Sequence, residues 1–388
     1  MQLLQNVYGF RGCIILYIVI SMMYVDFVQQ IIPITEFQSV WQLSDWLQFG
    51  KWGIHMFHSI EGYAQYLLIS SNYQKPNQYL LIFISLYLKT ALPLWVTLII
   101  TTSLPNFKTA NFVGSASYKE FFLIPDKNLF ERHGNYIYHY YATSFVLNAF
   151  LLSMIAIDRY LSKKHNIILN ITLIIVITII IGCLNDCFQT TILYNTHQSL
   201  EQLEFYYYYT GLDSTSYFVG VLFSNLLNKF ELQNAKFIHT VQPQKSQFGR
   251  KIIEIDKSAL ISDIFISTCV LLLFALIRLT HSHFAIIGIF SAILKQLYKI
   301  IFSFIFMLCF VFCMLKSKHL MPSKIQQIGA NSQWIVVCTN TITTLNLYLF
   351  SNIQFGPYSD TCLVLFLIAC TIQLLYFSFL ISSIFGPL

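Results

Sequence analysis

Long apolar runs separated by short polar stretches dominate this 388-residue sequence. A helix that crosses a bilayer needs about 20 mostly apolar residues. Runs of this kind occupy 9–32, 79–103, 136–158, 166–187, 264–294, 297–315, 334–353 and 361–385, and a shorter one occupies 216–228. They are too long for strands and lack the alternation of polar and apolar residues that strands show. The pattern therefore predicts an all-α polytopic membrane protein with six to eight membrane helices.

Charged residues are scarce for a chain of this size. Asp, Glu, Lys and Arg make up 10% of the residues, whereas a typical soluble domain carries about 25%. This scarcity excludes an ordinary soluble enzyme, an acidic disordered protein and a nucleic-acid-binding protein, which needs a basic face. The nine cysteines are scattered, several inside apolar runs, where free Cys behaves as a small hydrophobe, so no metal, disulfide or cofactor is expected.

The polar segments divide the chain into four regions. Region 1–135 holds one span followed by interfacial or accessory segments, and 136–228 holds further membrane helices. A polar block at 229–258 is rich in Lys and Arg, and the positive-inside rule places it on the matrix or cytoplasmic side. Region 259–388 is almost free of charge and contains the candidate chemistry.

One arginine is stranded inside a long apolar run. Between Ile264 and Leu294, Arg278 is the only formally charged residue, and it lies near the middle. An ionised guanidinium at bilayer depth costs at least about 2.5–3.5 kcal/mol on insertion scales, so such a residue is read first as functional. The structural alternative is an arginine that caps carbonyl groups inside a helix bundle.

A lone glutamine occupies the matching place in the last run. No charged side chain occurs from Thr361 to Leu388, and Gln373 is central in that stretch. By itself, a glutamine in a membrane helix more often joins two helices by hydrogen bonding. The polar segment 316–333 is centred midway between Arg278 and Gln373. We therefore predict a long antiparallel hairpin of tilted helices that places the two side chains opposite each other.

Two short motifs carry a family resemblance. Leu273–Thr280, LFALIRLT, resembles the arginine-bearing helix of ATP synthase subunit a, which is mitochondrial subunit 6. Cys370–Phe377, CTIQLLYF, resembles the final helix of that family, which carries a partnering glutamine. The likeness covers about 265–290 and 361–385. Ser282 stands where the family usually has Asn.

The resemblance implies a proton-translocating stator subunit. Arg278 would lie between two aqueous half-channels and face a ring of c subunits, and Gln373 would orient the guanidinium or the ring carboxylate. The half-channels need titratable or polar steps, and the candidates are Asp263 on the matrix side, His281, Ser282, His283 and Asp360 on the other, and Asp186. Each His could instead be a packing residue, and Asp186 could simply end a helix. No nucleotide binding and no catalytic activity of the isolated chain are expected.

The implied partners are the c-subunit ring, other Fo and peripheral-stalk subunits, membrane lipids and protons as the transported ion. The implied location is the mitochondrial inner membrane, and the abundance of Ile, Phe, Tyr, Asn and Lys suggests an organelle-encoded protein. Two alternatives stay open. One is a proton-pumping or accessory membrane subunit of a respiratory complex, although Lys89 is the main mid-span lysine and has no evident mid-span Glu to pair with. The other is a structural membrane scaffold.

Overall fold

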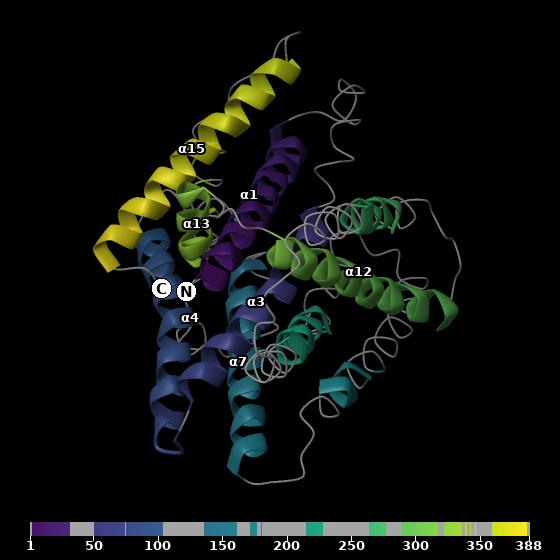
Figure 1. Cartoon of the computed structure of the whole chain (residues 1–388). Coiled ribbons are helices and arrows are strands. Elements are labelled where there is room, and N and C mark those ends of the chain that lie inside the picture. Colours follow the sequence, from purple (N-terminus) through teal and green to yellow (C-terminus); the bar gives the residue numbers. More distant parts are fainter. Residues whose placement is uncertain are drawn as a thin grey trace, which may run out of the picture. The chain divides into compact units, whose positions relative to one another are not determined.

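The computed structural model describes residues 2–31, 50–73, 75–103, 136–160, 171–176, 180, 215–227, 264–276, 289–316, 322–335, 338, 339, 342, 346 and 359–385. Every regular element among these residues is a helix, which confirms the all-α prediction for this part of the chain (Figure 1). Six of the predicted site residues lie outside the described residues: Asp186, Asp263, Arg278, His281, Ser282 and His283. The predicted basic block 229–258 lies outside them too.

Seven labelled helices follow one another along the chain. They are α1 (Gln2–Ile31), α3 (Gly50–Asn72), α4 (Gln78–Ser103), α7 (Tyr136–Tyr160), α12 (Ile289–Lys316), α13 (Ser323–Ala330) and α15 (Ser359–Phe385). Two shorter apolar helices span Thr215–Leu227 and Ile264–Leu276.

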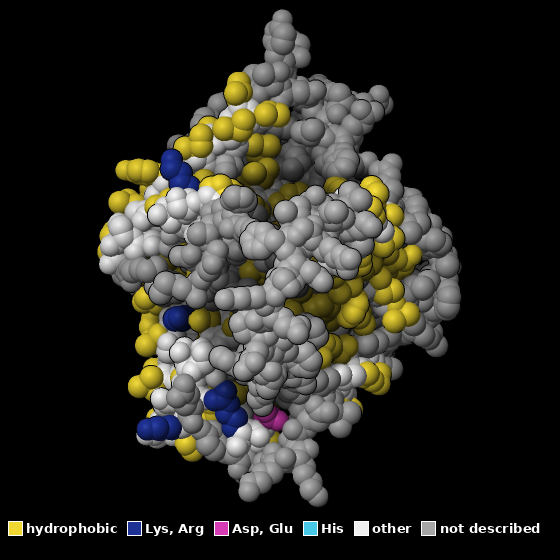
Figure 2. Space-filling view, in the orientation of Figure 1, with side chains coloured by type: hydrophobic (Ala, Val, Ile, Leu, Met, Phe, Trp, Pro, Cys, Tyr) yellow, Lys and Arg dark blue, Asp and Glu magenta, His cyan; other side chains and the backbone are white. Residues whose placement is uncertain are grey.

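Three of these helices could cross a membrane. Parts of α4, α12 and α15 are long and apolar enough to do so, at Gln78–Val96, Leu297–Met314 and Val364–Ile384. The described surface seen in Figure 2 is mostly hydrophobic, with only a few Lys and Arg side chains. A surface of this kind is typical of a protein that meets lipid rather than water. The structure thus supports membrane association.

The chain forms two compact units. Unit 1 comprises Met1–Phe57, Asn77–Leu152 and Met321–Leu388, and unit 2 comprises His58–Pro76 and Ser153–Leu320.

In unit 1, α1 and α13 cross at a pair of glycines. A Cβ on Gly12 would collide with the carbonyl oxygen of Ile325 and would lie 3.0 Å from the backbone nitrogen of Gly329. A Cβ on Gly329 would collide in turn with the carbonyl oxygen of Tyr8. Small residues let two helix backbones approach this closely, which is how helices pack where lipid removes the hydrophobic driving force.

Helix α13 lies in the polar segment that the sequence predicts as a turn. Pro322 precedes it in an extended conformation, and its carbonyl oxygen accepts hydrogen bonds from the backbone nitrogens of Ile325 (2.9 Å) and Gln326 (3.1 Å). Ile328 and Gly329 are buried, while Lys324 and Gln327 are exposed. The segment is polar because it is a short amphipathic helix with one buried face.

Polar and aromatic contacts join the other helices of unit 1 to their neighbours. Ser382 of α15 donates to Oδ1 of Asn331, the residue that follows α13, at 2.6 Å, and both side chains are buried. Phe145 of α7 packs edge-on against Phe83 and Tyr87 of α4, with ring centres 5.5 and 5.4 Å apart. These contacts fix α15 and α4, two of the three candidate spans, to their neighbours within the unit.

In unit 2, α3 and the helix Thr215–Leu227 cross at a second glycine pair. A Cβ on Gly62 would collide with the carbonyl oxygen of Tyr217, and a Cβ on Gly220 would collide with that of Ser59. Helix α12 packs against both partners, through Phe304 on Phe223 (5.1 Å) and Phe310 on Tyr63 (5.3 Å). The three helices therefore converge around the middle of α3.

Candidate functional site

The structure places one half of the predicted arginine–glutamine pair. Gln373 is the fifteenth of the 27 residues of α15, lies inside the candidate span Val364–Ile384, and is half-buried. Asn346 Nδ2 donates to Gln373 Oε1 at 3.2 Å and to Cys370 Sγ at 3.3 Å. Asn346 is itself 2% exposed, so its amide is held by the surrounding side chains. Asp360 is the second residue of α15.

The hydrogen bond from Asn346 determines which further hydrogen bonds Gln373 can make. An amide oxygen has two acceptor positions and the nitrogen has two donors. With one acceptor position taken by Asn346, the oxygen can still accept from a guanidinium, and the nitrogen can donate to a carboxylate. Asn346 was not identified from the sequence, although an Asn inside the apolar run 334–353 is the signal that could have identified it.

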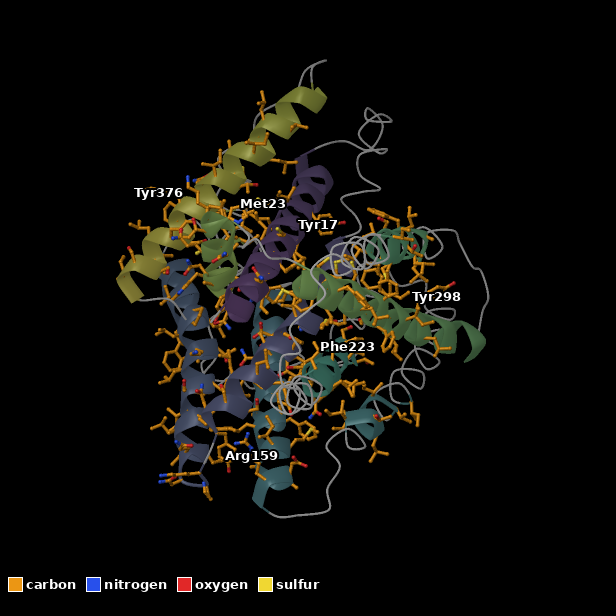
Figure 3. All side chains as sticks on the ribbon, viewed as in Figure 1. Tyr17, Met23, Arg159, Phe223, Tyr298 and Tyr376 are labelled. Carbon is orange, nitrogen blue, oxygen red and sulfur yellow. The ribbon has the colours of Figure 1, made fainter. Side chains whose placement is uncertain are left out.

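Gln373 borders an apolar stripe on α15. Large side chains recur along one face at helical spacing, with exposed fractions between 51% and 68%: Leu365, Ile368, Ile372, Tyr376 and Ile384. Tyr376 is labelled in Figure 3 on this helix. Leu374, by contrast, is completely buried. An exposed apolar stripe with a polar group at its edge suits contact with lipid or with other membrane helices.

A second set of polar side chains is buried in unit 2. Glu61 is 1% exposed at the centre of α3, and Gln65, one turn later, donates to its Oε1 at 2.8 Å. On the neighbouring helix Thr215–Leu227, Ser216 and Tyr217 are buried, and Ser303 of α12 donates to Ser216 Oγ at 2.8 Å. Lys299, one turn before Ser303, is 4% exposed. Sequence reasoning missed these residues.

The electrostatics of this set link α3 to the neighbouring helix. Tyr217 lies outside the three candidate spans, and burial raises the pKa of its phenol well above the ordinary value. The negative charge of Glu61 adds to that rise, because it disfavours a second anion nearby. The geometry agrees, because the backbone of Tyr217 lies against Gly62, the residue next to Glu61, at the glycine crossing of the two helices.

The end of α3 is held by an arginine. Arg159, near the end of α7 (Figure 3), donates through Nη2 to the carbonyl oxygen of Ser70 at 2.6 Å and through Nη1 to that of Tyr73. The last carbonyls of a helix have no partner within the helix and carry partial negative charge, so a guanidinium stabilises them. On α3 itself, the hydroxyl oxygen of Tyr66 accepts a hydrogen bond of 2.7 Å from the buried Asn225. Both contacts hold α3 in place.

A further cation is buried in unit 1. Arg11 of α1 is 7% exposed, and its guanidinium carbon lies 5.2 Å from the centre of the Phe57 ring. Such a contact between a cation and an aromatic ring is attractive and gains strength when water is excluded. The sequence places Arg11 near the end of a span, whereas the structure shows it buried in unit 1.

Within the described part of the chain, no three His, Cys, Asp or Glu side chains are grouped so that they could hold a metal ion. The six cysteines described there carry free thiols.

Comparisons of the chain with protein-family models, with curated proteins and with solved structures find no match. The class of protein follows from the described residues alone. It is a helical, membrane-associated protein with polar and ionisable side chains buried among apolar helices.

Proposed function

We propose that this chain is the proton-translocating stator subunit of a rotary ATP synthase, similar to subunit a. The observation that carries the proposal is the position of Gln373, central in a charge-free candidate span and held by Asn346 at the edge of an apolar stripe. A polar group placed in this way can meet a ring carboxylate within the membrane. The arginine motif Leu273–Thr280 supports the proposal from the sequence.

In this mechanism Arg278 acts as a permanent positive charge. A guanidinium does not lose its proton at any physiological pH. It attracts the deprotonated carboxylate of each passing ring subunit, and it favours the ionised form because a nearby opposite charge lowers a carboxyl pKa. It also separates the two half-channels, so that protons cross only by way of the ring. Gln373 donates to the carboxylate or accepts from the guanidinium and so orients the pair.

The proposal includes the finer architecture predicted from the sequence. The chain has six to eight spans and a long C-terminal hairpin facing the c-subunit ring. It lies in the mitochondrial inner membrane beside other Fo and peripheral-stalk subunits. Asp263 serves the matrix-side half-channel, His281, Ser282, His283 and Asp360 serve the other, and Asp186 is a further candidate.

The role of Gln373 is tested through its partner Asn346. Replacing Asn346 with Leu removes the donor while keeping a side chain that branches at Cγ and has the same number of heavy atoms. We expect proton-driven ATP synthesis in membrane vesicles to fall by roughly 2- to 10-fold, the equivalent of one neutral hydrogen bond worth about 0.5–1.5 kcal/mol. Thr339→Val is the matched control, because Thr339 is also buried and bonds only locally, to the carbonyl oxygen of Ile335 at 2.7 Å.

Equal rates of ATP synthesis in the Asn346→Leu and Thr339→Val complexes, both fully assembled, would argue against a functional Gln373. Assembly is measured by the amount of complex recovered on native gels, so that loss of the complex is not mistaken for loss of proton transfer.

A second function is favoured by the buried side chains of unit 2. Proton-pumping membrane subunits of respiratory complexes use intramembrane Lys and Glu residues, and here Lys299 and Glu61 are both buried while Lys89 is exposed. Such a subunit would not need Arg278 to face a ring. Measuring ATP synthesis and respiration-driven proton pumping in the same Arg278 variant separates the two functions.

A further inference from the structure

Glu61 occupies an unusual place for a carboxyl group. It is the twelfth of the 23 residues of α3, and the residues on both sides, Ser59, Ile60 and Gly62, are buried. A charged side chain that is not paired or hydrogen-bonded is very costly in such surroundings. A buried ionisable residue in a membrane-associated helix bundle is therefore first considered as a functional group.

The helices packed against Glu61 supply a line of polar groups. The backbone of Tyr217 lies against Gly62, the residue after Glu61, and the neighbouring Ser216 accepts a hydrogen bond from Ser303 of α12 at 2.8 Å. Lys299 lies one turn from Ser303 on the same helix. Hydroxyl groups both donate and accept hydrogen bonds, so they can pass a proton between an acid and a base.

The buried titratable groups on these three helices are few. They are His55, His58, Glu61, Tyr63 and Tyr66 on α3, Tyr217 on the helix Thr215–Leu227, and Lys299 on α12. Burial favours the neutral form of a carboxyl group, and a cation nearby favours its ionised form.

We propose that Glu61 is a proton-transfer group inside unit 2, linked through Tyr217 and the Ser216–Ser303 hydrogen bond to Lys299. A carboxylate oxygen of Glu61 takes a proton from a hydronium ion, so that one O–H bond of the hydronium breaks to leave water while an O–H bond forms on the neutral acid. When the acid later releases the proton, its O–H bond breaks and a new bond to hydrogen forms on the acceptor, which regenerates the carboxylate. Gln65 donates to Oε1 in both states. This inference rests on the proposed function only in taking protons as the transported ion.

The direct test is carbodiimide labelling of the intact complex. Dicyclohexylcarbodiimide is apolar and reacts with protonated carboxyl groups in apolar surroundings, and mass spectrometry locates the adduct. We expect Glu61 to be labelled in the wild-type protein, with labelling that falls as the pH is raised. Glu61→Gln has no carboxyl group at this position and should give no adduct there. Absence of the adduct at every pH from acidic to alkaline would overturn the inference.

Glu61→Gln supplies the transport test. It keeps the shape and the bond from Gln65 but cannot exchange a proton, and we expect proton flux into vesicles to fall at least about tenfold. Asp158→Asn is the matched control, since Asp158 is a half-buried carboxyl group of the same unit, and it should leave flux unchanged. Glu61→Asp should retain part of the flux, whereas a purely structural role predicts equal loss in Glu61→Gln and Glu61→Asp.

The proposed function and the inference about Glu61 can be overturned independently of each other. Full flux in Glu61→Gln together with lost ATP synthesis in Arg278→Ala would overturn the inference about Glu61 and leave the proposed function standing. Normal synthesis in Arg278→Ala together with pH-dependent labelling of Glu61 would do the reverse.

Discussion

Replacing Arg278 with Ala is expected to abolish proton-driven ATP synthesis while the complex still assembles. The guanidinium is the only fixed positive charge in the run Ile264–Leu294, and no neighbouring residue in that run can replace it. Loss of one preorganised charge-stabilising group typically costs about 100- to 1000-fold in rate. The measurement is ATP synthesis in membrane vesicles driven by an imposed proton gradient, alongside the amount of assembled complex.

Two further variants test whether the effect is specific to the guanidinium of Arg278. Arg278→Lys keeps a cation but can lose its proton when buried, so it should restore little activity. Arg250→Ala removes an arginine from the predicted polar block 229–258 and should leave synthesis unchanged. Undiminished synthesis in an assembled Arg278→Ala complex would contradict the proton-path role, and loss of assembly alone would favour the scaffold alternative.

The second large effect is expected at the glycine crossing of unit 2. Gly220→Ala places a methyl group against the carbonyl oxygen of Ser59, 2.8 Å from its carbonyl carbon and 3.0 Å from the backbone nitrogen of Tyr63. Backbone atoms cannot rotate away, so α3 and the helix Thr215–Leu227 must separate. We expect the free energy of unfolding to fall by about 1–3 kcal/mol, the usual cost of overpacking. Denaturation of the purified chain in detergent micelles measures it.

Gly53→Ala is the matched control for this prediction. Gly53 is also a buried glycine of α3, but a Cβ there would meet side-chain atoms of Ile18 (2.8 Å) and Tyr17 (3.1 Å). Side chains can shift, so the cost should be smaller. If Gly53→Ala proved as destabilising as Gly220→Ala, close approach of the two backbones would not be what holds unit 2 together.

The helices of unbroken apolar runs could be predicted from the sequence. Runs 79–103 and 136–158 correspond to α4 and α7 almost to the residue. Helix α3 was not predicted as a span, because Lys51, His55, His58 and Glu61 interrupt its apolar pattern. It forms nevertheless, and its central residues are buried. Burial among other helices, rather than exposure to lipid, allows such a helix to carry polar residues.

Of the candidate site around Gln373, only Gln373 itself could be identified from the sequence. Gln373 stands out because nothing charged surrounds it, but its partner Asn346 is separated from it by 27 positions and is recognisable only after folding. The same is true of Glu61 and Lys299. Glu61 lies beside the glycine crossing between α3 and a helix more than 150 residues away, and no local pattern in the sequence predicts that packing.

The neighbour of Arg278 in the native complex tests the central claim most directly. We would tag the chain, purify its assembly from the membrane and determine the structure by electron cryomicroscopy. The account predicts that Arg278 and Gln373 face a ring of small helical hairpins, each with a carboxyl group at mid-membrane depth. An assembly without such a ring, or with both side chains turned away from it, would contradict the account.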